Sequence, residues 1–369
     1  MVKEEKKAPK LRFNGYTNDW ERKELNNILK INSGRDYKQL NSGNIPVYGT
    51  GGYMLSVNDK LSDTDAVGIG RKGTIDKPLY LKAPFWTVDT LFYCTSKENS
   101  DVKFIYLLFQ IINWKRYDES TGVPSLSKNT ISNIKTYVPK IKEQDYISKL
   151  FFSLDNTLQL HERKCEELIL IKKALLQKLF PKRDEVRSEV RYKNFSDAWK
   201  QRKLRDVVKT TIGEFVIKTK QKEDSPYPVY NGGTSYTGFY DDYNNDSNKI
   251  IISARGANAG FVNIVRQRYW AGNSCYSLSI LNNQEMDLDY LYQMLKQRQH
   301  LFTDFQQAAN IPSVSKKDVE TFKVYTPSFE EQKKIGLFLT RFDSLIDLHQ
   351  RKLEKLKQLK KFLLQNMFI

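Results

Sequence analysis

Cysteine and histidine are scarce, with three of each among the 369 residues. Cys94, Cys165 and Cys275 form neither a Cys-x-x-Cys pair nor the even set of a disulfide framework, which is typical of a protein kept in a reducing cytoplasm. Two of the histidines, His161 and His349, lie in helical repeats, so little remains for a zinc site or a Ser/His/Asp triad. We therefore expect a cytoplasmic protein that binds no metal itself.

Short motifs that mark catalytic proteins are also missing. No glycine is followed by lysine, which excludes a P-loop. No proline is followed by proline, so the Asn-Pro-Pro-aromatic signature of amino-group methyltransferases is absent, and none is followed by aspartate, which usually opens a restriction-nuclease metal site. No apolar run reaches the length of a membrane span, and the charged start is unlike a signal peptide. We expect a chain that catalyses nothing and has no membrane partner.

Positive charge, in contrast, is abundant. The formal net charge is +17 and the pI is near 9.4, which indicates a polyanionic partner. Anionic lipid could also attract such a chain, but no basic amphipathic segment is joined to a membrane anchor. Nucleic acid is therefore the expected partner class.

The stretch from Glu331 to Phe368 predicts one long helix, because it contains no proline and a single glycine. Its residues at alternating spacings of four and three form a heptad seam, which requires a helical partner. The seam comprises Ile335, Leu339, Phe342, Ile346, His349, Leu353, Leu356, Lys360, Leu363 and Met367.

A second copy of this helix occurs in the middle of the chain. Shifting back by 188 residues gives Ile147, Phe151, Leu154, Leu158, His161, Cys165, Leu168, Lys172, Leu175 and Leu179. Two matching seams in one chain most simply pack on each other, and they pair antiparallel because the second helix must return along the first. A polar residue in a seam fixes register more often than it binds metal, so we interpret both histidines as register residues.

The repeat extends into the segments that precede both helices. Trp86 matches Trp270, and Val123–Lys128 matches Ile311–Lys316. The expected fold class is α+β, with two mixed α/β domains related by an internal repeat and separated by two long helices packed as an antiparallel coiled coil. The expected limits are 1–142 for the first domain, 143–180 for the first helix, 181–329 for a charged linker and the second domain, and 330–369 for the second helix.

Local patterns predict some elements inside these domains. Strands are expected at 46–48, 66–69, 85–93, 249–253 and 269–281. Helices are expected after Asp101 and Asp287, which would cap them. Ser328 and Glu331 predict a capping box for the second long helix, while Lys140 takes the serine's place in the first copy.

A glycine-rich segment follows a predicted strand in the first domain. Gly68–Gly73 spells Gly-x-Gly-x-x-Gly, but Pro78 blocks the helix that would receive a dinucleotide's phosphates. Aligning Arg71 with Arg255 puts Ile252, Ala254 and Ala257 at the glycine positions of the second copy. We therefore expect a hairpin that lets Arg71 and Lys72 approach a phosphate or a guanine edge, with Arg255 doing the same in the second domain.

Each domain also contains a loop of small residues and tyrosines, at 48–53 and 230–236. Such loops suit close approach to bases or phosphates, although a plain β-turn with core tyrosines explains any one of these residues equally well. The candidate DNA-binding residues are Tyr48, Thr50, Tyr53, Arg71, Lys72, Lys128, Tyr230, Asn231, Tyr236, Arg255, Asn258 and Lys316.

Each long helix begins with the pattern Pro-x-x-x-Glu-Gln, at Pro139…Glu143-Gln144 and again at Pro327…Glu331-Gln332. With the two divergent domains, this pattern resembles the specificity subunit of type I restriction–modification systems. The resemblance implies a non-catalytic subunit of a DNA adenine methyltransferase and ATP-dependent endonuclease. Each domain would read one half of a bipartite target in double-stranded DNA.

The same resemblance implies partners. Two methylation subunits would dock on the helical stalk, and restriction subunits would join them. S-adenosylmethionine, ATP and magnesium would be held by those partners, with no cofactor bound by this chain.

Two alternatives stay open. One is a coiled-coil scaffold whose basic domains bind nucleic acid without sequence preference, which the divergence between matched domains disfavours. The other is a self-sufficient methyltransferase, which the missing motifs disfavour and which cofactor binding by the isolated chain would reveal.

Overall fold

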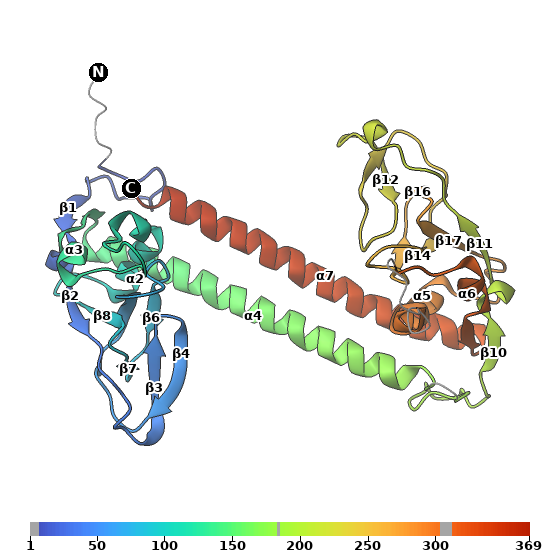
Figure 1. Cartoon of the computed structure of the whole chain (residues 1–369), viewed down its shortest axis with the longest axis horizontal. Coiled ribbons are helices and arrows are strands. Elements are labelled where there is room, and N and C mark those ends of the chain that lie inside the picture. The colour runs from blue at the N-terminus through green and yellow to red at the C-terminus, as the bar shows by residue number, and fades with distance from the viewer. Residues whose placement is uncertain (1–6, 183–184, 303–311) are drawn as a thin grey trace. The chain divides into compact units, whose positions relative to one another are not determined.

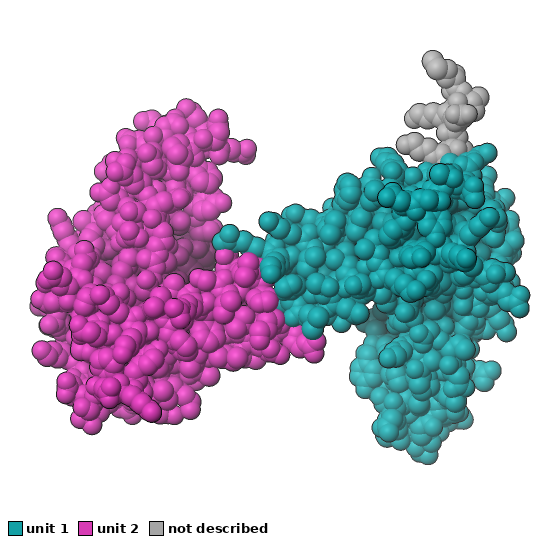
Figure 2. All heavy atoms as spheres, turned by 180° about the vertical axis from the view of Figure 1, so that it is seen from behind, with its two compact units in different colours: residues 1–162, 351–369 teal, residues 163–350 magenta. Residues whose placement is uncertain are grey.

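The computed structural model describes residues 7–182, 185–302 and 312–369 (Figure 1). The chain divides into two compact units (Figure 2). Unit 1 comprises residues 1–162 and 351–369, and unit 2 comprises residues 163–350. Each unit therefore contains one expected domain together with parts of both long helices. The division into separate functional segments at residues 142, 180 and 329 stays a prediction.

The two long helices, α4 (Ile141–Leu179) and α7 (Phe329–Asn366), begin and end within a few residues of the expected limits. Every predicted seam position on them is buried or partly buried. In unit 1, Asp155 pairs with Lys360 at 2.6 Å and Glu162 pairs with Lys357 at 2.9 Å. Residue numbers thus rise on one helix as they fall on the other, which confirms antiparallel packing.

Unit 1 contains three small sheets and several short helices. Its strands are β1 (Glu21–Glu24), β2 (Leu29–Ser33), β3 (Ser42–Gly49), β4 (Gly52–Val57), β5 (Ala66–Gly70), β6 (Leu79–Leu81), β7 (Trp86–Thr87), β8 (Leu91–Ser96) and β9 (Lys135–Val138). The helices are α1 (Leu25–Ile28), α2 (Val102–Ile111), the 3-10 helix η1 (Trp114–Tyr117) and α3 (Lys128–Asn133). The sheets have the orders β2-β8-β5-β6, β4-β3-β7 and β1-β9.

Unit 2 repeats this arrangement. Its strands are β10 (Lys200–Lys203), β11 (Val208–Ile212), β12 (Tyr227–Tyr230), β13 (Gly238–Tyr240), β14 (Lys249–Ser253), β15 (Val262–Val265), β16 (Trp270–Ala271), β17 (Cys275–Ile280) and β18 (Lys323–Thr326). The helices are η2 (Leu204–Asp206), η3 (Lys218–Lys220), α5 (Leu288–Gln297), η4 (Gln299–Phe302) and α6 (Lys316–Thr321). The orders β11-β17-β14-β15, β13-β12-β16 and β10-β18 match those of unit 1 strand for strand, which confirms the repeat.

The single strands expected at 85–93 and 269–281 are wrong, because each region forms two strands in different sheets. In unit 1, β7 pairs parallel with β3, whereas β8 pairs antiparallel with β2 and β5. The turn between them is closed by Leu91 N donating to Val88 O at 3.0 Å. The run between β16 and β17 turns in the same way, through Cys275 N and Gly272 O.

The predicted helix caps at Asp101 and Asp287 are confirmed. Asp101 Oδ1 accepts a hydrogen bond from Lys103 N at 2.6 Å, and Asp287 Oδ1 accepts one from Tyr290 N at 2.8 Å. Only one of the two hydrogen bonds of the capping box expected at α7 is formed, the one accepted by the serine side chain. Ser328 Oγ accepts from Glu331 N at 3.4 Å, but the Glu331 carboxylate is bonded to Arg191 instead.

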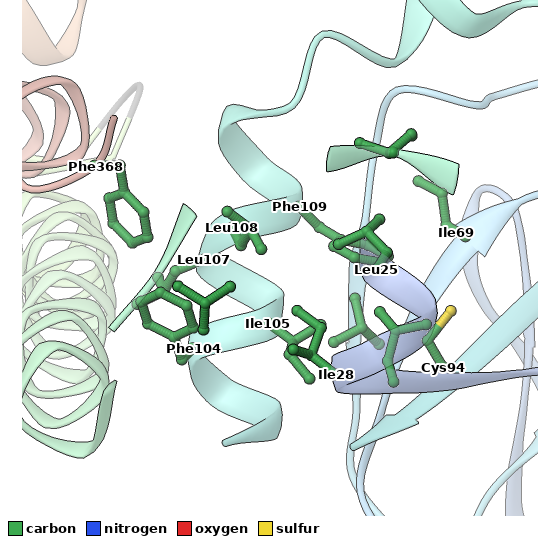
Figure 3. Packing of buried hydrophobic residues seen from close by; sticks show 14 of the residues in the cluster. Leu25, Ile28, Ile69, Cys94, Phe104, Ile105, Leu107, Leu108, Phe109 and Phe368 are labelled. Carbon is green, nitrogen blue, oxygen red and sulfur yellow. The ribbon is translucent and has the colours of Figure 1, made fainter. Parts of the chain in front are cut away.

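The core of unit 1 joins its domain to the end of α7. Phe368, beyond the last turn of α7, stacks on Phe104 of α2 with ring centroids 5.5 Å apart, while Leu25, Ile69 and Cys94 lie on the far side of α2 (Figure 3). At this junction the backbone of Leu11 N donates to Asn366 O at 2.9 Å.

Unit 2 has the equivalent junction at the end of α4. Val190 N donates to Lys178 O at 3.0 Å, and the rings of Phe180 and Trp199 lie 6.4 Å apart, as Phe368 and Trp20 do at 6.2 Å in unit 1. Each domain is thus attached to the start of one long helix and to the end of the other.

Candidate nucleic-acid interface

The glutamate of the Pro-x-x-x-Glu-Gln pattern holds the segment that leads into each domain. Arg12 Nε and Nη2 each donate to one oxygen of Glu143 at 2.8 Å. In unit 2, Arg191 binds both oxygens of Glu331 at 2.9 and 2.6 Å. The hydrogen bonds that each arginine donates to its glutamate raise the pKa of that arginine, so both guanidinium groups stay charged.

The glutamine of the same pattern connects the start of the long helix to the N-terminus of an earlier helix in the same domain, α2 in unit 1 and α5 in unit 2. Gln144 Nε2 donates to Pro139 O at 2.8 Å, and its Oε1 accepts from Asp101 N at 2.9 Å. Gln332 makes the same bonds to Pro327 O and Asp287 N, each at 3.0 Å. The pattern therefore fixes each domain to the start of its long helix.

Three predicted DNA-binding residues of unit 1 lie together in one pocket. Arg71, Lys72 and Lys128 line a cavity of about 380 Å³, which we call the basic pocket. The basic pocket is lined by Ser33, Arg71, Lys72, Phe92, Glu119, Ser125, Leu126, Ser127 and Lys128. Arg71 and Lys72 follow β5, and Lys128 is the first residue of α3.

Backbone hydrogen bonds connect the two loops that form this pocket. Leu126 N donates to Arg71 O at 2.9 Å, and Gly73 N donates to Pro124 O at 2.8 Å. Gly73 has a φ of +90°, which favours glycine at this turn. The expected hairpin after β5 is therefore present, and a distant loop of the chain fixes its position.

Phe92 lies close to two of the basic side chains. Its ring centroid is 5.9 Å from Arg71 Cζ and 5.8 Å from Lys128 Nζ, within the range of cation–π attraction. Sequence analysis missed Phe92 and Ser33, which are paired across β8 and β2. It also missed Glu119, Ser125 and Ser127. Knowing which strands and loops pair would have been needed to find them.

The tyrosine hairpin of unit 1 reaches the same region. Tyr48 and Tyr53 are opposite one another in β3 and β4, with ring centroids 6.4 Å apart, and Tyr53 is exposed. At the hairpin tip, Thr50 Oγ1 lies 3.9 Å from where a Cβ on Gly73 would stand. The structure thus brings Thr50 close to the loop that carries Arg71 and Lys72.

In unit 2, the corresponding loop shows that the alignment of Arg71 with Arg255 is wrong by one residue. Arg255 forms an antiparallel β-bridge with Ser313, as Lys72 does with Ser125 in unit 1. Likewise, Val314 N donates a hydrogen bond to Ala254 O, as Leu126 N does to Arg71 O. Arg255 therefore stands in the position of Lys72. Buried Ala254 stands in the position of Arg71.

The glycine comparison changes with this correction. Gly256, with a φ of +92°, corresponds to Gly73, so the turn glycine is retained and Ala257 does not replace it. The residues that replace the other two glycines become Ile251 and Ser253. The alignment by sequence favoured the shared arginine, whereas the backbone pairing follows the turn.

The remaining candidates of unit 2 have mixed surroundings. Tyr236 is exposed and its ring lies 6.5 Å from that of Tyr230. Asn231 Oδ1 accepts from Ser274 N at 3.2 Å, so this side chain supports the loop itself. Asn258 is exposed, and Lys316, the first residue of α6, forms an ion pair with Glu320 at 3.5 Å.

Residues 17–169 and 196–358 match the model of a family described as the type I restriction modification DNA specificity domain. The chain belongs to this family. Each match covers most of one domain and its following long helix, so the chain contains two type I specificity domains.

Two curated relatives are specificity subunits of the same type. One, from Methanocaldococcus jannaschii, is 24% identical over 280 residues, covering 69% of this chain and 65% of the relative. The other, from Mycoplasma pneumoniae, is 26% identical over 155 residues, covering 42% of this chain and 41% of the relative. The matched part thus spans less than two thirds of either relative.

A solved structure shares the fold along nearly the whole chain. The crystal structure of the type I restriction–modification S subunit from M. genitalium aligns with a TM-score of 0.79 at 18% identity. The alignment covers 98% of this chain and 99% of that one.

Within the described ranges, no helix is long and apolar enough to cross a membrane. Those ranges also contain no group of three or more His, Cys, Asp or Glu side chains that could hold a metal ion.

Burial raises the pKa of Cys94 and of Cys275 to about 12, so both thiols stay protonated at neutral pH.

Proposed function

We propose that this specificity subunit reads a bipartite target in double-stranded DNA, with one half-site per domain. The observation that carries the proposal is one arrangement built twice with different side chains. A basic loop lies beside a tyrosine hairpin in each domain, but Arg71, Lys72 and Phe92 of unit 1 are replaced by Ala254, Arg255 and Tyr276 in unit 2. Binding without sequence preference would not require such differences.

The outer faces of the long helices support docking of two methylation subunits. Leu160 and its repeat equivalent Leu348 are 57% and 47% exposed, and Ile171 and its equivalent Leu359 are 46% and 45% exposed. Apolar residues exposed on a helix suit a partner helix. Because the exposed positions occur in both copies, one kind of partner would bind twice.

In this proposal the subunit itself is non-catalytic. S-adenosylmethionine would be held by the methylation subunits, and ATP and magnesium by restriction subunits. A helix of the length of α4 spans roughly 58 Å at about 1.5 Å per residue, so the helical pair would hold the half-sites apart and leave the DNA between them unread.

Mapping methylated adenines in cells that carry this chain and its methylation subunit tests the proposal. We expect two short half-sites separated by a gap of constant length and free sequence. A single continuous motif would contradict the bipartite target, and methylation without any motif would favour a scaffold that binds DNA non-specifically. Methyl transfer by the purified chain alone would contradict a non-catalytic role.

A further inference from the structure

The basic pocket contains a carboxylate among its three cations. Glu119 Oε1 accepts hydrogen bonds from Ser127 Oγ, at 2.9 Å, and from Thr130 Oγ1. Both donors bind the same oxygen of Glu119. Among the described residues, none donates a hydrogen bond to its other oxygen, Oε2, and Glu119 forms no ion pair with Arg71. The lining of this one pocket therefore contains both a free acceptor and a free set of guanidinium donors.

The loops that contain Arg71 and Glu119 are both hydrogen-bonded to the same segment, Ser125 and Leu126. Leu126 N donates to Arg71 O at 2.9 Å, and Glu119 N donates to Ser125 O at 3.0 Å. Asp118 Oδ1 accepts from Ser125 N at 2.9 Å and so fastens the same loop again. Two backbone positions held by adjacent residues keep their spacing when DNA arrives, which favours recognition of a rigid ligand.

The carboxylate distinguishes two kinds of DNA contact. A pocket for a backbone phosphate gains nothing from an ordered carboxylate, because the two anions repel each other. A base pair, in contrast, offers both acceptors and donors in the major groove. Guanine presents O6 and N7 as acceptors, and its partner cytosine presents the N4 amino group as a donor.

We propose that the basic pocket reads one G·C base pair of the first half-site. The Arg71 guanidinium donates to guanine O6 and N7, and Glu119 Oε2 accepts from cytosine N4. Lys72 and Lys128, at the edge of the same pocket, contact the phosphates beside this pair. The inference rests on the proposed function and names the residues that give one of its domains its sequence preference.

Unit 2 provides an internal comparison. The position of Arg71 is occupied there by Ala254, which is buried and has no donor to offer a base. Arg255 stands where Lys72 stands and is assigned the phosphate contact. The second half-site is therefore read by other side chains, and its sequence is independent of Arg71 and Glu119.

The test uses the full chain with its methylation subunits and records the DNA sequences that the complex selects from a randomised library. The variants are Arg71→Ala, Arg71→Lys and Glu119→Gln, and Arg116→Ala, an exposed arginine of η1 outside the pocket, is the matched control. Lysine keeps the charge of Arg71 but not its paired donors, so it separates a base contact from a phosphate contact.

We expect Arg71→Ala and Arg71→Lys to lower the preference for G·C at one position of one half-site by roughly five- to 150-fold, the range for a bidentate base contact. Glu119→Gln relaxes the same position, and Arg116→Ala changes nothing. Retention of the second half-site shows that each variant is folded.

Three results would overturn the inference. Arg71→Ala could weaken all sequences alike with recovery in Arg71→Lys, which indicates a phosphate contact. Arg71 and Glu119 could affect different positions, or neither could affect any. In each of these cases the wild-type complex still selects a bipartite target, whereas failure of the proposed function shows in the wild type itself.

Discussion

Two buried ion pairs connect single residues far apart in the sequence. Arg12 with Glu143 and Arg191 with Glu331 each place a carboxylate side chain, 3% and 1% exposed, against a guanidinium. Such a pair contributes little net stability compared with apolar packing. Removing one partner, however, leaves the other charge buried and uncompensated, which is strongly destabilising.

We expect Arg12→Ala and Arg191→Ala each to lower the free energy of unfolding by about 3–5 kcal/mol, because Glu143 or Glu331 is then left buried and unpaired. Calorimetric unfolding of the full chain measures the effect. Lys164→Ala is the control, since its pair with Glu167 is exposed and should change stability by less than about 1 kcal/mol. Equal effects of all three variants would contradict a special role for the buried pairs.

The half-buried Lys296 should make the stability of unit 2 depend on pH. Burial, with a smaller contribution from Lys172, lowers the pKa of Lys296 from 10.5 to about 8, although its Nζ donates to Val262 O at 2.8 Å. Between these two pKa values the unfolded chain binds more protons than the folded one, so this residue makes stability rise with pH.

The matched variant is Lys296→Met, which cannot be protonated. Relative to it, the wild type should gain thermal stability as pH rises from about 8 towards 10, and the comparison cancels other titrating groups. Unfolding temperatures of both proteins across this range provide the measurement. A constant difference would show that Lys296 keeps an ordinary pKa.

Residue roles that depend on distant partners were beyond sequence reasoning. Glu143 and Gln144 could be recognised as part of a pattern, but nothing local indicates that Arg12 or Asp101 would meet them. Arg71, Lys72 and Lys128 were found because charge and small residues are local signals. The misplacement of Arg255 arose because identity in a loop says less about register than backbone pairing does.

At the scale of elements, the pairing of α4 with α7 is fixed by charge as well as by the seam. Lys172 pairs with Asp343, and Lys360 pairs with Asp155 at 2.6 Å. Lys360 and Asp343 are the repeat equivalents of Lys172 and Asp155, so one ion pair is made twice with the helices exchanged. Only an antiparallel arrangement permits this exchange.

Reversing one charge of such a pair should destabilise the helical pair, and reversing both should restore it. We expect Lys360→Asp to cost roughly 1 kcal/mol or more, with most of it recovered when Asp155→Lys is added. A thermal double-mutant cycle measures the coupling. The same exchange in the exposed pair Lys149–Asp145 of α4 should show almost none, and equal coupling in both cycles would argue against a register role.

Elements with local signals were predicted well. The long helices follow from heptad spacing, and α2 and α5 follow from their aspartate caps. The strand pairs β7–β8 and β16–β17 could not be separated, because a continuous apolar and aromatic run does not show where a chain passes from one sheet to another.

At the scale of the whole molecule, the proposed function makes helix length set the gap between half-sites. The ion pairs show that Leu168 lies opposite Asp347, so seven residues can be inserted after Leu168 and, on the facing helix, before Asp347 without disturbing the seam. One heptad adds roughly 10 Å at about 1.5 Å per residue, or about three base pairs.

Methylation mapping of this double insertion should show the same two half-sites with a longer gap. The matched control inserts three residues at each place, which rotates the apolar seam away from its partner and should reduce methylation altogether. A changed half-site sequence with a constant gap would contradict the spacing role of the helices.

The two equivalent junctions, Leu11 with Asn366 and Val190 with Lys178, have a consequence for heredity. One junction is bridged by peptide bonds and the other by none, although both contain the same backbone hydrogen bond. Under the proposed function, we expect a gene of half this length, encoding one domain and one helix, to give a chain that assembles as two identical copies and selects a palindrome. If the proposed function holds, an asymmetric DNA target follows from duplication and divergence of one domain-and-helix module, and each half of the gene can change its own half-site without altering the other.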